Sequence, residues 1–393
     1  MNIASGNLQW YDILLIGVYA AILLPVPFFA LRAMRPRKGT LEWIAQYDRG
    51  SMHLTQPRKA LTGRDAVWLL LTGAAAVLVA AVVLLLQIKL YSPQNMRSMT
   101  PAYYVKYYAY PMAGAVFVFL LARDALQTTV GGVFAGVIMA AEPLGDRLPV
   151  ALLTLSLYCL HRWLTAGEER RLLLTEPWLY ASALLLGVCA LMDWTMFWLL
   201  PFYAVCFAAK CFARGRSGRR GSGRRLTLSL LLFVLVCLLA AAAAVSLHAV
   251  RSGWTELSGL PQLWMERSLY TRCLERARWV WAYCTARPAC DPLRVLAHLL
   301  PTLLLGVCAL PMLLSGLLRR RDAQALFILG LLLSFAAAWV LTGSFRALPA
   351  LALAGSYLLT HYVTRRKNLL APLCAVLCAS YPIVFWCLIL LTR

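Results

Sequence analysis

The sequence predicts an all-α polytopic membrane protein with about twelve transmembrane helices. Hydrophobic residues make up 61% of the 393 residues and gather in long runs, which short breaks rich in Arg and Lys separate. A soluble domain needs a largely polar exterior, and this composition does not supply one. A bilayer removes that requirement. Each spanning segment must then close its own backbone hydrogen bonds, so runs of this length are expected to be helices and not barrel strands.

The lengths of the apolar runs set the expected spans, because a hydrocarbon core of about 30 Å needs about 20 helical residues. The expected spans are 11–33, 67–91, 109–123, 127–142, 148–163, 177–191, 194–211, 226–249, 297–317, 324–341, 347–363 and 369–391. Two of the runs, 127–142 and 177–191, are short for a crossing. We expect them to be half-spanning, broken or buried among neighbouring helices.

The positions of the cations predict the orientation. When successive breaks are assigned alternately to two faces, 25 of the 38 Lys and Arg residues fall on one face and 13 on the other. The richer face includes 34–66, 212–225, 319–321 and 365–367, and the positive-inside rule makes it cytoplasmic. The chain is therefore expected in the cell membrane with both termini external.

Residues 1–63 are expected to form an extra N-terminal transmembrane helix and a basic cytoplasmic segment, ahead of a transmembrane domain over 64–393. The run at 11–33 is too long for the apolar region of a signal peptide, and Arg and Lys follow it in place of a small-residue cleavage site. The net charge of +22 is accounted for by topology and by attraction to anionic membrane lipids, so we expect no nucleic-acid partner.

The twelve cysteines are mostly single residues inside apolar runs, where Cys usually packs as a small hydrophobe. The predicted external loop 250–296 contains three cysteines. A disulfide between Cys284 and Cys290 is one possibility in that loop. No Cys/His cluster has the spacing of metal ligands, so we expect no structural zinc.

Acidic residues are few, and three lie where short external turns are expected. Glu142 and Asp146 frame one turn, and Asp193 lies in another. Ionisable groups at this depth usually face a water-filled cavity or a partner, and desolvation raises the pKa of a carboxyl group toward the range of a general base. The alternative is structural: Asp146 pairs with Arg147 or caps the next helix at its N-terminus.

External arginines form the second group of candidates, because the planar guanidinium suits phosphate recognition. In the loop 250–296, apolar residues recur at helical spacing and predict an interfacial helix over about 261–283. Its apolar face is expected to consist of Leu263, Tyr270, Leu274, Ala277 and Trp281. Arg267 and Arg276 lie within it, and Arg346 interrupts an apolar stretch near the same face. Two interpretations of these arginines are open. They bind the phosphate of a specific lipid ligand, or they make the ordinary contacts of surface arginines with membrane lipid headgroups.

From about Arg64 onward, the order of several short motifs resembles the bacterial branch of the protein O-mannosyltransferase family. That family belongs to the membrane glycosyltransferases of the GT-C class, which use polyprenyl-phosphate sugars. The motifs are Arg64-Asp65-Ala66, Tyr91-Ser92-Pro93-Gln94, Gly145-Asp146-Arg147, Asp193-Trp194-Thr195, Arg321-Asp322, Trp339, Phe345-Arg346 and Tyr381-Pro382.

The resemblance implies a GT-C-like helical architecture and transfer of a sugar from a polyprenyl-phosphate carrier at the outer face. It implies an external carboxylate as general base, with Asp146 the first choice, and Arg or Lys on the carrier phosphate. The sequence departs from the family in four places. The segment 92–108 contains no Asp or Glu, and Asp193 replaces a Lys. The external loop 250–296 is short and lacks the family's His-rich and Trp-Pro motifs, and residues 1–63 have no counterpart in the family. Sequence alone therefore leaves three functions open: a glycosyltransferase or inactive relative, a lipid or solute transporter, and a non-catalytic membrane partner.

The resemblance names a lipid-linked sugar as donor substrate and implies no certain cofactor. The resemblance does not decide whether a divalent cation takes part. It also does not give the sugar, the acceptor or the oligomeric state.

Overall fold

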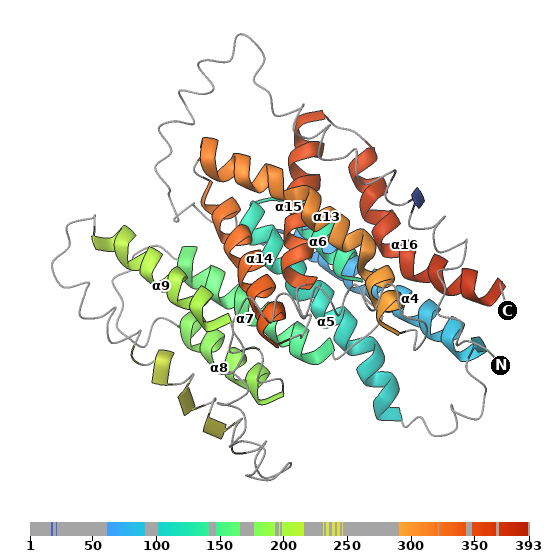
Figure 1. The fold of residues 1–393 in the computed structure, drawn as a ribbon, viewed down its shortest axis with the longest axis horizontal. Helices are drawn as coiled ribbons and strands as arrows, with labels where there is room; N and C mark the ends of the chain where they lie inside the picture. The colour runs from blue at the N-terminus through green and yellow to red at the C-terminus, as the bar shows by residue number, and fades with distance from the viewer. Residues whose placement is uncertain are drawn as a thin grey trace.

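The described part of the chain is helical throughout, in a computed structural model of all 393 residues (Figure 1). The structure describes residues 61–90, 101–140, 147–165, 177–192, 199–215, 291–320, 322–342, 348–366 and 369–391, with isolated positions elsewhere. The helices are α4 (Gly63–Leu90), α5 (Pro101–Leu126), α6 (Thr129–Ala140), α7 (Arg147–Thr165), α8 (Pro177–Met192), α9 (Leu200–Gly215), α13 (Asp291–Arg320), α14 (Ala323–Thr342), α15 (Leu348–Arg366) and α16 (Leu370–Leu391).

Three of the described helices contain a stretch that is long and apolar enough to cross a membrane. These stretches are Gly63–Leu86, Tyr108–Leu126 and Pro301–Leu318. Shorter apolar stretches occur at Thr129–Ala140, Pro177–Met192, Ala323–Ala338 and Ala371–Val384. The helical membrane class is thus supported, whereas twelve full-length crossings are not shown. The expected spans 11–33 and 226–249 lie almost entirely outside the described residues.

Several helix boundaries differ from the sequence expectation. Helix α5 begins at Pro101, so the second half of the expected loop 92–108 is helical. Helix α13 begins at Asp291, inside the expected loop 250–296. In both cases polar and aromatic residues at a helix end lower the local hydropathy, although they do not interrupt the helix. The expected interfacial helix over 261–283 lies outside the described residues.

The helices run alternately between two ends of the bundle, as the first four show. An ion pair joins Asp65, at the start of α4, to Arg123, near the end of α5, over 2.9 Å. The Thr129 hydroxyl, at the start of α6, donates to Asp65 as well. Near the end of α7, Arg162 pairs with Asp124 over 2.7 Å. We call the end of the bundle that contains these ion pairs the Asp65 end, and we call the opposite end the far end.

Helices α7, α8 and α9 continue the alternation. The Cys189 thiol, near the end of α8, donates to the Pro149 carbonyl near the start of α7, so these two helices are antiparallel. The Lys210 ammonium, in the second half of α9, donates to the carbonyl of Trp163, in the last turn of α7. Helix α9 therefore runs parallel to α7, and α8 ends at the far end of the bundle.

The C-terminal helices follow the same rule. A Cβ placed on Gly131 of α6 would lie 3.1 Å from the hydroxyl of Thr360 of α15, so α15 ends where α6 begins. The Tyr357 hydroxyl of α15 donates to Asp322, which precedes α14, over 3.1 Å. A Cβ placed on Gly316, near the end of α13, would lie 2.6 Å from that same hydroxyl. The end of α13, the start of α14 and the end of α15 therefore lie at the Asp65 end.

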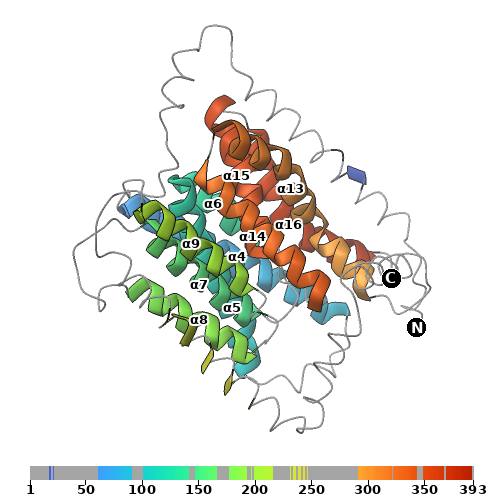
Figure 2. The same cartoon turned by 60° about the vertical axis from the view of Figure 1, so that its left-hand side comes forward.

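Helix α6 occupies the centre of the bundle. It contacts α4, α5, α15 and α16, and Figures 1 and 2 both place α8 on one flank and α13 and α16 on the other. Glycines allow this close packing. A Cβ on Gly136 would lie 2.2 Å from Thr72 Cγ2 of α4, and one on Gly132 would lie 3.0 Å from the Phe119 carbonyl oxygen of α5. Small residues at such contacts are typical of helices packed in membranes.

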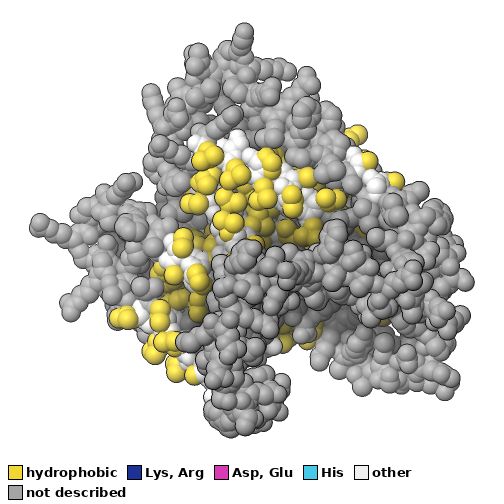
Figure 3. Space-filling view, in the orientation of Figure 1, with side chains coloured by type: hydrophobic (Ala, Val, Ile, Leu, Met, Phe, Trp, Pro, Cys, Tyr) yellow, Lys and Arg dark blue, Asp and Glu magenta, His cyan; other side chains and the backbone are white. Residues whose placement is uncertain are grey.

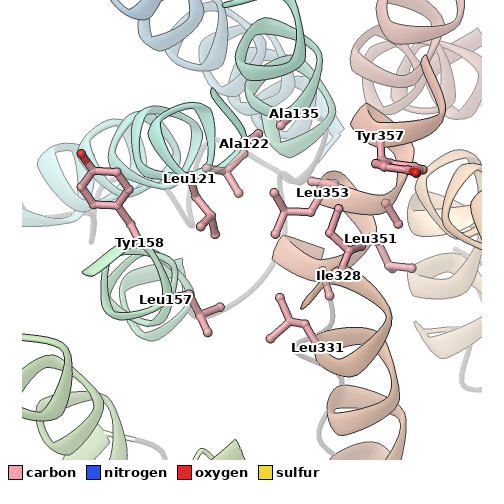
Figure 4. Packing of buried hydrophobic residues seen from close by; sticks show 14 of the residues in the cluster. Leu121, Ala122, Ala135, Leu157, Tyr158, Ile328, Leu331, Leu351, Leu353 and Tyr357 are labelled. Atoms are coloured by element: carbon pink, nitrogen blue, oxygen red, sulfur yellow. The ribbon is translucent and has the colours of Figure 1, made fainter. Parts of the chain in front are cut away.

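One continuous core joins the two flanks. In Figure 4, Leu121 of α5 and Leu157 of α7 face Ile328 and Leu331 of α14. Leu353 of α15 lies between this group and α6. All five side chains are fully buried. Hydroxyl groups fasten one part of this core. Ser156 of α7 and Ser182 of α8 each donate to the other's carbonyl oxygen over 2.8 Å. Their hydrogen bonds hold α7 and α8 at close range without leaving a buried polar group unmet.

The outside of the bundle is apolar. Leu70, Leu78 and Leu85 of α4 are 60–70% exposed, and Leu318 of α13 is 78% exposed. Other exposed apolar residues lie on α8, α14 and α16, including Leu184, Leu333 and Val376. On the face shown in Figure 3, the described surface is mostly hydrophobic. Water does not tolerate contiguous apolar surface on this scale, whereas lipid does.

Candidate functional site

The residues that the sequence singled out lie almost entirely outside the described part of the chain. They are Glu142, Asp146, Asp193, Arg346, Arg267 and Arg276. Arg147 opens α7, and its side chain is outside the described residues as well. The helix ends that flank these residues are described, and they lie as follows.

Those flanking helix ends gather at the far end of the bundle. Because Cys189 lies against Pro149, the end of α8, which precedes Asp193, lies beside the start of α7, which follows Asp146. A Cβ on Gly355 would lie 3.1 Å from Ile138 Cδ1, near the end of α6. The start of α15, which follows Arg346, thus lies on the same side as the end of α6, which precedes Glu142.

A cluster of buried charges occupies the Asp65 end. It consists of Asp65, Arg123, Asp124 and Arg162. Arg123 donates to Asp65 over 2.9 Å and to Asp124 over 3.1 Å. Arg162 pairs with the other oxygen of Asp124 over 2.7 Å. The side chains of Asp65, Arg123 and Asp124 are 3–8% exposed, and that of Arg162 is 17% exposed. Two acids and two bases alternate, so the charges cancel within the cluster.

Helix termini explain where three of these four charges lie, Asp124 being the exception. Thr62 and Asp65 form a reciprocal capping pair: the Asp65 carboxylate accepts from the Thr62 amide over 3.0 Å, and the Asp65 amide donates to the Thr62 hydroxyl over 3.3 Å. Acids are favoured at the positive N-terminus of a helix and bases at its negative C-terminus. Asp65 begins α4, whereas Arg123 and Arg162 stand in the last turns of α5 and α7. The helix ends thus favour these charges before the ion pairs add to them.

Aromatic rings complete the surroundings of Arg162. Its guanidinium carbon lies 5.2 Å from the centre of the Tyr158 ring and 5.5 Å from that of the Trp178 ring. Its Nε also donates to the Tyr158 hydroxyl over 2.8 Å. Cation–π contacts of this kind offset part of the cost of removing a guanidinium from water. Since Trp178 begins α8, the contact also ties α8 to the end of α7.

The cluster is suited to holding helices together and not to acid–base chemistry. Asp65 accepts from Arg123, Thr129 and Thr62, and Asp124 accepts from two arginines. A general base needs a lone pair that can reach a substrate proton, and these oxygens already have partners. Within the described residues, no group of three or more His, Cys, Asp or Glu side chains could hold a metal ion.

Sequence inspection did not predict this cluster, although signals for it exist. The pattern Thr62-x-x-Asp65 before an apolar run is a capping signature, and Arg123-Asp124 ends another apolar run. The pairing itself spans 58 residues, and no local pattern encodes it. The expected packing role is confirmed for six of the described cysteines, which are all buried, whereas Cys387 is partly buried; the six are Cys159, Cys189, Cys206, Cys308, Cys374 and Cys378. Cys284 and Cys290 lie outside the described residues.

Comparison with protein-family models, with curated proteins and with solved structures gives no match for this chain.

Proposed function

We propose that the chain is a multi-pass membrane glycosyltransferase of the GT-C type, or a diverged relative of one. It transfers a sugar from a polyprenyl-phosphate carrier to an acceptor at the outer face of the cell membrane. The proposal combines the order of motifs in the sequence with the helical bundle and its apolar exterior. The Asp65 end faces the cytoplasm in this proposal, because the basic breaks belong to that end.

The observation that carries the proposal is the gathering of helix ends at the far end. Three segments connect helix ends on this side: that with Glu142 and Asp146, that with Asp193, and that with Arg346. A carboxylate as general base and a guanidinium on the carrier phosphate are the two groups that such a transfer needs. The buried cluster at the Asp65 end has the complementary role of holding the opposite end of the bundle closed.

The test is sugar transfer by the purified chain in lipid vesicles, with a polyprenyl-phosphate sugar as donor. Replacing Asp146 with Asn keeps size and polarity but removes the base, so we expect transfer to fall about 10²–10⁴-fold. Asp48→Asn is the matched control, since it removes a carboxylate from the segment 34–66 on the other face. Undiminished transfer by Asp146→Asn would exclude Asp146 as the base.

A non-catalytic membrane partner is the second candidate, and one observation favours it. Residues 92–108, where the resembling family carries its catalytic acid, contain no Asp or Glu. If the unmutated chain transfers no sugar from any of a range of polyprenyl-phosphate donors, this second function replaces the first. Co-purification of a catalytic protein from native membranes would then be the expected finding.

A further inference from the structure

We draw no further inference here: the strongest candidate, the exposed apolar stripe of α4 through Val67, Leu71, Leu78 and Leu85, carries none because nothing in the structure shows what covers it.

Discussion

At the scale of single residues, most of the described charges lie where helix termini favour them, whereas Asp124, an acid in the last turn of α5, is held by two arginines. Lys210 illustrates the rule: its ammonium donates to the Trp163 carbonyl in the last turn of α7 and lies 4.0 Å from the centre of the Trp163 ring. Carbonyls of a last helical turn have no partner within the helix, so a cation is favourable there. The same reasoning explains Asp322, which accepts from the Gln324 amide over 2.9 Å at the start of α14.

Arg123 is expected to be the most sensitive charge of the cluster. Arg123→Met leaves Asp65 without its ion pair and takes one of two arginines from Asp124, which costs about 3–5 kcal/mol because the charge left behind is buried. The measurement is the free energy of unfolding in detergent micelles. Arg162→Met is the matched control and should cost less, because its side chain is more exposed and pairs with one acid among the described residues. A loss below about 1 kcal/mol for Arg123→Met would contradict a clamping role.

The reciprocal serines give a second, smaller prediction. Ser156→Ala removes the hydrogen bond to the Ser182 carbonyl and that with the Tyr203 hydroxyl, which is 2.7 Å away. Hydrogen bonds between membrane helices are worth about 0.6 kcal/mol on average and up to about 1.7. We expect a loss within that range in the same unfolding measurement. Ser334→Ala, whose hydroxyl bonds only within its own helix, is the control and should have a smaller effect.

At the scale of elements, α6 is the helix on which the arrangement depends. Its glycine face allows contact with α4 and α5 at backbone distance, and Gln127, with φ 54°, makes the turn that leads into it. The Gln127 side-chain amide donates to the Asp124 carbonyl over 2.6 Å, which satisfies one of the last carbonyls of α5. A left-handed residue in a turn this short lets α6 fold back immediately along α5.

The glycine face can be tested by adding one methyl group. Gly136→Ala places a Cβ 2.2 Å from Thr72 Cγ2, so α4 and α6 must separate, at a cost of about 1–3 kcal/mol. Gly63→Ala is the matched control, since nothing lies within 4 Å of its Cβ. Adding Thr72→Ser removes the clashing methyl and keeps a hydroxyl for the Trp68 carbonyl, so stability should recover in the double variant. Failure to recover would show that the clash is not the cause.

At the scale of the whole molecule, the alternation of helix directions agrees with the order of the basic breaks in the sequence. The segment 34–66 leads into the start of α4 and 212–225 continues from the end of α9, and both of these helix ends lie at the Asp65 end. The positive-inside rule then predicts that this side is cytoplasmic. Cysteines engineered into 34–66 should therefore resist an impermeant thiol reagent applied to intact cells and react once the membrane is permeabilised. Efficient labelling from outside would reverse the orientation of the whole chain.

Hydropathy along the sequence predicts the helical membrane class and the approximate positions of most described helices. Hydropathy is a local property, because the length and composition of an apolar run decide whether it can cross a bilayer as a helix. Helix α4 coincides closely with the run at 67–91, and α16 with the run at 369–391. The shortness of the run at 127–142 also predicts an exceptional helix, and α6, which lies within that run, has 12 residues.

Which residues contact one another is a property of the packed bundle. Arg123 pairs with Asp65 across 58 positions because α4 and α5 pack in one register, and that register depends on side chains from both helices. The level of Ala140 beside Ala76 is likewise a property of packing and not of local sequence. Local preferences choose a helix, but the relative height and rotation of two helices come from the shapes that fit between them. For that reason the charge cluster at the Asp65 end emerged from the fold and not from the sequence.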